Sequence, residues 1–225
     1  MSSSETSFTE IHARIAHAAA QHGQSARLLA VSKTKPADAV RRLAGLGQRA
    51  FGENYVQEAL AKQGELADLA LEWHLIGPLQ SNKCREVAEH FDWLQSLDRA
   101  KLIAPLARWR PPARGPLQVL IQVNIDDEAS KSGCRPEQLP ELAEAIAAQP
   151  ALCLRGLMAI PAPHADRALR VRAFAAMRGL FDTLRTGHAG IDTLSMGMSD
   201  DFELALAHGA TMVRIGSALF GARSA

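Results

Sequence analysis

Short apolar runs alternate with amphipathic segments along most of the chain. Residues 5–22 carry apolar side chains at helical spacing from Phe8 to Ala18, so a helix is expected ahead of the first strand. From there on, each short apolar run is typical of a strand and each segment between two runs is typical of a helix. The predicted strands are 28–33, 49–54, 71–77, 91–97, 117–125, 152–160, 191–196 and 211–215.

The helices predicted between these strands lie at 37–46, 55–69, 81–90, 98–109, 136–148, 166–185 and 201–208. Eight strands alternating with helices is the pattern of a (β/α)8 barrel. We therefore predict an α/β fold, a single (β/α)8 TIM-type barrel with an extra N-terminal helix, in one domain over residues 1–225. An open doubly wound sheet has the same alternation, but the turn after the first strand lacks the glycine-rich signature that such sheets usually carry.

The first strand is expected to end in a lysine. With a period of two, Lys33 follows Leu29 and Val31 on one face, so it would extend a buried row. An ammonium group is costly to desolvate there, and a neutral amine beside a carbonyl ligand can form a Schiff base. A lysine whose amine simply reaches solvent is the alternative.

Polar residues or methionine also stand at the ends of other strands, and in a barrel these ends meet at one mouth. Arg214 lies in an apolar strand and requires an acceptor, because its guanidinium cannot be neutralised. His74 fits a hydrogen-bonded core histidine equally well, and Lys131 fits a solvated loop residue. The expected mouth residues are Lys33, Asn54, His74, Lys131, Met158, Ser195 and Arg214.

The loops after the seventh and eighth strands have the composition of a phosphate site. Glycine lets backbone N–H groups approach an anion, and serine hydroxyls add donors. Asp200 would repel a phosphate, so we expect it to cap the following helix, with Glu203 three residues on, and to point away. The loop residues are Gly197, Met198, Ser199, Gly216 and Ser217. A Schiff-base lysine, a phosphate cradle and a buried arginine together indicate pyridoxal 5'-phosphate (PLP).

Composition excludes several classes of function. The net charge of +1 is spread along the chain, which argues against nucleic acid as a partner, and no apolar run is long enough to cross a membrane. Three cysteines without metal or disulfide spacing favour a reducing cytoplasm. Only six of the 25 basic residues are lysines, and four of them stand at or after the ends of predicted strands: Lys33, Lys35, Lys83 and Lys131.

Six motifs, at 30–36, 51–58, 73–83, 156–160, 194–201 and 213–216, resemble the pyridoxal phosphate homeostasis proteins, the YggS/PROSC family. The resemblance implies a barrel similar to the N-terminal domain of alanine racemase. It also implies that Lys33 forms the Schiff base and that Arg214 faces the pyridine nitrogen. The predicted cofactor-binding residues are Lys33, Asn54, His74, Met158, Ser195, Gly197, Met198, Ser199, Arg214, Gly216 and Ser217.

The resemblance implies a role in intracellular PLP (vitamin B6) homeostasis and cofactor carriage, and we expect no catalytic turnover. An arginine at the ring nitrogen leaves that nitrogen unprotonated and weakens the electron sink. The chain's only tyrosine, Tyr55, is assigned to the helix after the second strand, so a second acid–base group for racemisation is missing. A PLP-dependent amino-acid racemase and a class I aldolase remain alternatives.

Partners are less defined by the sequence. PLP-dependent apoenzymes are the candidate recipients of the cofactor, and the chain is expected to be a monomer or a weak homodimer. Whether Lys35, Lys83 or Lys131 forms a second cofactor site stays open at this stage.

Overall fold

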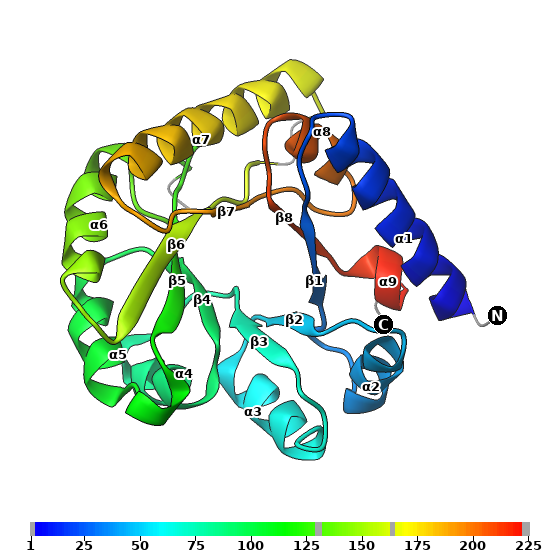
Figure 1. Cartoon of the computed structure of the whole chain (residues 1–225), viewed down its shortest axis with the longest axis horizontal. Helices are drawn as coiled ribbons and strands as arrows, with labels where there is room; N and C mark the ends of the chain where they lie inside the picture. Colours follow the sequence, from blue (N-terminus) through cyan, green and yellow to red (C-terminus); the bar gives the residue numbers. More distant parts are fainter. Residues whose placement is uncertain (1–2, 129–131, 163–164, 222–225) are drawn as a thin grey trace.

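Eight parallel strands close into a barrel in chain order, with β8 pairing back to β1 (Figure 1). The computed structural model describes residues 3–128, 132–162 and 165–221. The closed barrel confirms the predicted fold and removes the open-sheet alternative, while the one-domain organisation stays a prediction. The strands are β1 (Arg27–Val31), β2 (Ala50–Glu53), β3 (Glu72–Leu75), β4 (Trp93–Leu97), β5 (Leu117–Gln122), β6 (Leu152–Met158), β7 (Thr193–Ser195) and β8 (Met212–Ile215).

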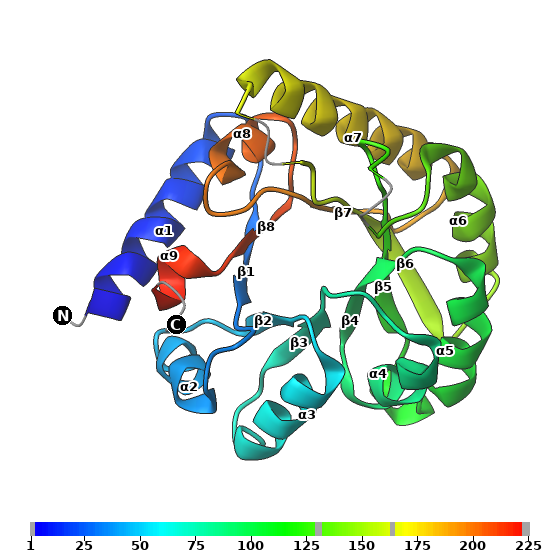
Figure 2. The ribbon, with the colours of Figure 1, turned by 180° about the vertical axis from the view of Figure 1, so that it is seen from behind.

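Helices surround the barrel on its outside (Figures 1 and 2). They are α1 (Ser3–Ala20), α2 (Ala37–Gly45), α3 (Val56–Glu65), α4 (Cys84–His90), α5 (Ile103–Trp109), α6 (Leu139–Ala147), α7 (Arg167–Gly187), α8 (Phe202–Ala207) and α9 (Ser217–Phe220). The predicted extra N-terminal helix is α1, which packs beside α8, α9 and α2. It covers the part of the barrel where the four-residue α9 is too short to do so.

Three predicted helices begin with a turn of 3-10 helix, and one 3-10 turn stands alone. The turns are η1 (Ser81–Lys83) before α4, η2 (Ala100–Leu102) before α5, η3 (Pro112–Arg114) before β5 and η4 (Pro136–Gln138) before α6. Six of the eight predicted strands end one to three residues too late, while the ends of β4 and β8 are as predicted. No helix in the described ranges is both long and apolar enough to span a membrane.

Side chains on the two faces of each strand have different surroundings. The outward side chains, such as Leu28 and Phe51, pack against the helices in one large apolar core. Two small apolar clusters are separate from that core, and one consists of Leu29, Ala50, Ile76 and Met212. The other consists of Trp93, Leu120 and Met158. They fill the barrel interior, as expected for a closed barrel of this size.

Polar side chains cross the interior between these apolar clusters. Gln95 on β4 contacts Met212 on β8 and Ser195 on β7, and neither strand is a neighbour of β4. These contacts therefore cross the inside of the barrel. All of Gln95 and Ser195 is shielded from solvent, and so is His74 on β3.

The first strand is shorter than predicted, which changes the position of Lys33. β1 ends at Val31, and the backbone then turns, with Lys35 N donating to Ser32 O at 3.0 Å. Thr34 takes a positive φ of 62° in this turn. Lys33 is therefore a half-buried residue of the turn and not the last residue of a buried strand row.

Candidate functional site

A cavity of about 570 Å³ opens at the C-terminal ends of the strands. The predicted site residues that line it are Lys33, Asn54, Met198, Ser199, Arg214, Gly216 and Ser217. The cavity also has polar lining residues outside the predicted set, namely Thr34, Lys35, Gln122, Asn124, Ser132 and Asp200. Lys35 had been left open as a second cofactor site, and Asp200 had been expected to point away. Each of these lining residues follows or ends a strand, so their position was the signal that could have found them.

Four predicted residues do not line the cavity. His74 and Ser195 lie deeper in the barrel, and both are completely buried. Met158 is also completely buried, in the interior cluster with Trp93 and Leu120. Gly197 has a φ of 90°, and a Cβ there would stand 2.5 Å from Ala205 Cβ. Its conformation serves the close packing of the chain against α8, which differs from the predicted approach to an anion.

A buried charge cluster holds the turn that carries Lys33. Lys62 on α3 is 5% exposed, and its amine donates to Ser32 O, Glu53 Oε1 and Glu58 Oε1, each at 2.7 Å. Ser32 Oγ also donates to Glu53 Oε1, at 2.6 Å. Burial raises the pKa of Glu53, and the hydrogen bonds from Lys62 and Ser32 act against that rise. The Ser32 carbonyl thus accepts from Lys62 and from Lys35 N, so these contacts stand where the chain leaves the sheet after Val31.

The same cluster fixes the backbone just after Lys33. Glu58 Oε1 accepts a hydrogen bond from Thr34 N at 2.5 Å, where the chain has its positive φ. The Lys33 side chain has no hydrogen bond or ion pair with any described residue, and it lines the cavity. One lysine of this region is thus bound by two carboxylates, while the other presents its amine to the cavity.

Arg214 forms the floor of the cavity and is 3% exposed. Its Nη1 donates to Ser195 O at 2.8 Å and to Ser195 Oγ at 2.9 Å, and its Nη2 donates to Ala159 O at 2.8 Å. No described residue accepts a hydrogen bond from its Nε–H. Burial lowers the pKa of Arg214 to about 10, so the guanidinium stays charged at neutral pH. The predicted need for acceptors is met by neutral oxygens.

The interior polar residues continue from Arg214 towards the opposite end of the barrel. Ser195 Oγ is 2.7 Å from Gln95 Oε1, and Gln95 Nε2 is 2.9 Å from His74 Nδ1. His74 Nε2 is 2.7 Å from Glu72 Oε1, which also accepts from Arg27 at 2.6 Å. His74 is therefore a hydrogen-bonded core histidine, the alternative left open from the sequence.

The pKa values of both His74 and Glu72 are lowered, which makes the histidine neutral and the glutamate charged. Burial lowers the pKa of His74, so its imidazole is neutral at pH 7. Burial opposes the charge of Glu72, but the hydrogen bond from His74 and the guanidinium of Arg27 outweigh it. They lower the pKa of Glu72 to about 2. Glu72 is thus a fixed anion at the end of the chain.

The loops after β7 and β8 come together as predicted, with one correction. Ser217 Oγ lies 3.4 Å from Ser199 Oγ, so the two hydroxyls adjoin the same part of the cavity. The helix cap, however, is Asp201, whose Oδ1 accepts from Met198 N at 2.7 Å. Met198 N–H is therefore occupied, and Asp200 lines the cavity instead of pointing away.

Tyr55 also departs from its predicted place. It is the N-cap of α3, it lines the cavity, and 62% of it is exposed at the rim. The helix begins one residue later than expected, because the backbone at Tyr55 is extended, with φ −122° and ψ 125°. Its assignment to this helix therefore does not by itself remove Tyr55 from the site.

The other candidate lysines differ in their surroundings. Lys35 lines the cavity, and its amine donates to Phe220 O at 3.3 Å and to Gly221 O at 3.2 Å. Lys83 forms an ion pair with Glu86 at 3.0 Å and does not line the cavity. Lys131 lies outside the described residues.

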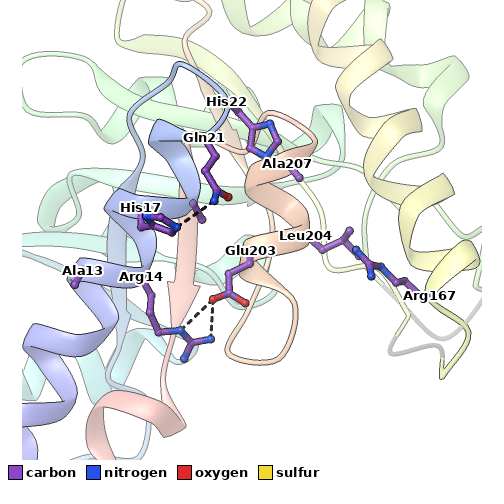
Figure 3. A pocket seen from close by; sticks show the side chains of 10 residues that line it. Ala13, Arg14, His17, Gln21, His22, Arg167, Glu203, Leu204 and Ala207 are labelled. Atoms are coloured by element: carbon purple, nitrogen blue, oxygen red, sulfur yellow. Dashed lines mark hydrogen bonds and ion pairs between the residues drawn. The ribbon is translucent and has the colours of Figure 1, made fainter.

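A second hollow, of about 550 Å³, lies on the outer wall between α1, α8 and the start of α7 (Figure 3). The ion pair between Arg14 and Glu203, at 3.0 Å, crosses it. None of the cofactor-binding residues predicted from the sequence lines this hollow.

Known proteins resemble the chain over nearly its whole length. Residues 7–224 match the model of the alanine racemase N-terminal domain family. A pyridoxal phosphate homeostasis protein of Pseudomonas aeruginosa is 57% identical, over 99% of this chain and 97% of that protein. One of Escherichia coli K12 is 52% identical, over 95% of this chain and 94% of that protein.

A solved structure gives the same result at lower identity. PipY of Synechococcus elongatus, solved with PLP bound, is 40% identical and has a TM-score of 0.80. The match covers 92% of this chain and 98% of that one. The chain belongs to the pyridoxal phosphate homeostasis family. The resemblance expected from the six motifs is thereby confirmed.

For this member of the homeostasis family, we predict that Lys62→Met lowers the free energy of unfolding by about 3–5 kcal/mol, because it leaves Glu53 buried without its cation. Urea unfolding followed by circular dichroism measures the loss. The control is the double variant Glu53→Gln/Lys62→Met, which removes both charges and should be clearly more stable than Lys62→Met alone. Equal stabilities would contradict a buried pair at this position.

The lowered pKa of Glu72 predicts a pH dependence of stability. Its folded-state pKa is about 2 against an ordinary 4.5, so its contribution is complete above pH 4.5 and is lost as the pH falls towards 2. Glu72→Gln should therefore flatten the stability curve across this window, by about 1–2 kcal/mol after allowance for solvent screening. Urea unfolding at several pH values tests this. Glu203→Gln, in the exposed pair with Arg14, should leave the slope nearly unchanged.

Proposed function

We propose that the cavity at the barrel mouth binds PLP and that the protein acts in intracellular PLP homeostasis by carrying this cofactor. Relatives at 52–57% identity are named pyridoxal phosphate homeostasis proteins, and PipY has been solved with PLP bound. The cavity of about 570 Å³ has the size usual for small cofactors.

The residues at the cavity fit the parts of PLP. Lys33 offers an amine to the aldehyde, and Ser199 and Ser217 offer hydroxyl donors to the phosphate. Gly216 connects the end of β8 to Ser217. Gly216 adopts a negative φ, and a Cβ there would make ordinary contact with Val31 at 3.4 Å, so the fold itself does not require glycine at this position. When bound, the cofactor supplies an aldehyde that a lysine amine can convert to a Schiff base.

One observation carries the proposal. Arg214 is buried and charged, its Nη atoms are used by backbone and serine oxygens, and its Nε–H has no acceptor among the described residues. This N–H is not sealed inside the protein, because Arg214 lines the cavity, so a ligand there can accept from it. A pyridine nitrogen without a proton is such an acceptor. Lys33 lines the same cavity, so amine and guanidinium can engage one ligand.

The absence of turnover is part of the proposal. Since arginine is a donor only, a ring nitrogen facing Arg214 stays unprotonated, and the ring then withdraws electrons poorly. This favours holding and passing on the cofactor over transforming amino acids. PLP-dependent apoenzymes are the proposed recipients.

A racemase is the second candidate, because Tyr55 lines the cavity and could supply an acid–base group. The two functions predict opposite results with purified, PLP-loaded protein. We expect no racemisation of alanine above the rate of free PLP, and activation of a PLP-free aminotransferase on mixing. Chiral chromatography and the aminotransferase assay measure these. Racemisation that Tyr55→Phe abolishes would establish the racemase instead.

For the cofactor attachment, we predict that borohydride reduction of the PLP-loaded protein labels Lys33, and that Lys33→Ala abolishes the label without unfolding the barrel. The fold should survive, because the Lys33 side chain has no hydrogen bond or ion pair with a described residue. Peptide mapping by mass spectrometry identifies the labelled residue. Lys35→Ala, at a second lysine lining the cavity, is the matched control and should keep the label. A label on Lys35 in the unmutated protein would overturn the assignment.

A further inference from the structure

The hydrogen bonds from Arg214 to Glu72 can run in only one direction. Arginine has five N–H donors and no acceptor, so Ser195 Oγ accepts from Arg214. The serine proton is then available only for Gln95, at 2.7 Å, and the atom of Gln95 that receives it is the amide oxygen. The orientation of the Gln95 amide thus follows from the arginine.

The remaining two links follow from the first two. With its oxygen towards Ser195, Gln95 presents its NH2 group to His74 Nδ1 at 2.9 Å. Nδ1 must therefore be unprotonated, and the single proton of the neutral imidazole is on Nε2, which donates to Glu72 Oε1 at 2.7 Å. We call this ordered chain of Arg214, Ser195, Gln95, His74 and Glu72 the interior relay.

Several groups around the interior relay hold it in this state. Trp93 stacks on the His74 ring, with centroids 5.1 Å apart. Glu72 and Asp92 act to raise the pKa of His74 and Arg27 acts to lower it, but burial dominates and keeps the ring neutral. Gln95 Nε2 also contacts Met212 Sδ at 3.1 Å. Three interior relay members, Ser195, Gln95 and His74, are completely buried.

We propose that Gln95 and His74 are positioning residues for PLP, which act through Ser195 to hold the Arg214 guanidinium with its Nε–H towards the cavity. The proposal rests on the proposed function. Without Gln95 the Ser195 hydroxyl is free to rotate and to compete for other acceptors, so Arg214 loses an acceptor of fixed direction. Neither Gln95 nor His74 lines the cavity, so an effect on PLP must pass through the interior relay.

The direction of the interior relay can be measured without cofactor. Nitrogen-15 NMR of the histidine-labelled apo protein should show His74 at pH 7.5 as the neutral tautomer with its proton on Nε2. Gln95→Glu reverses the middle link, because a carboxylate accepts from both sides, and it places His74 between two anions. In this variant both nitrogens of His74 should be protonated at pH 7.5. His74→Asn identifies the signal.

The effect on the cofactor is tested with Gln95→Met, which keeps the side-chain volume and carries no charge. PLP titration should show an affinity lower by about tenfold to a hundredfold, the range for losing a hydrogen bond to a charged group. Gln48→Met is the matched control. Gln48 is 5% exposed and donates to Leu28 O and Ala50 O outside the interior relay, so this change should lower stability but leave PLP affinity unchanged.

The outcomes separate the two proposals. A wild-type protein that does not bind PLP overturns the proposed function before any variant is compared. If the wild-type protein binds PLP and Gln95→Met binds it as tightly as the wild type or as Gln48→Met, the positioning role alone is overturned. A proton on Nδ1 of His74 in the wild-type apo protein overturns the direction of the interior relay.

Discussion

The charge of Arg214, buried inside the barrel, determines much of the surrounding structure. A guanidinium cannot give up its proton at neutral pH and cannot accept a hydrogen bond, so every neighbour must present an oxygen to it. The backbone carbonyls of Ser195 and Ala159 meet this demand at the ends of β7 and β6. At the far end of the interior relay, Glu72 forms its own ion pair with Arg27 at 2.6 Å. The neutral groups between Arg214 and Glu72 therefore connect two charges through ordered hydrogen bonds.

Two lysines near the mouth have opposite environments, and the contrast explains their separate roles. The Lys62 amine donates to three buried or half-buried oxygens, so it serves the packing of the fold and is not presented to the cavity. Lys33 stands two residues beyond β1, on a turn that the Lys62 cluster holds from behind. Rigid support behind a free amine limits the conformational freedom that binding would otherwise remove. The cluster is therefore structural, and its effect on Lys33 is exerted through the backbone of Ser32 and Thr34.

The sequence predicted the barrel well, because alternation of apolar runs and amphipathic segments is a local signal that burial preserves. It did not predict the cluster around Lys62 or the interior relay, since polar contacts between different elements leave no periodic pattern. Each nevertheless had one signal in the sequence. Lys62 occupies a position on the buried face of α3 with Val56 and Ala59, and Gln95 interrupts the apolar strand β4. The position of Lys33 was misjudged because strand periodicity was extended past Val31. The chain leaves the ladder there owing to contacts with α3 that no local pattern reveals.

The cavity combines a rigid floor with an open rim, and this division bears on carriage. Arg214 and the residues beneath it are buried and fixed by hydrogen bonds, so the ring end of a ligand would meet a preformed partner. At the rim, Met198 is 38% exposed and Tyr55 is 62% exposed, and Asp200 places a negative charge beside the serine hydroxyls. In the proposed orientation, that carboxylate would repel the phosphate dianion that the hydroxyls attract, and binding at the exposed end would be weaker. A carrier must release its cofactor. A site that holds the ring nitrogen firmly and the phosphate moderately would let the phosphate end leave first, and the proposed bond to Lys33 would be the last to break.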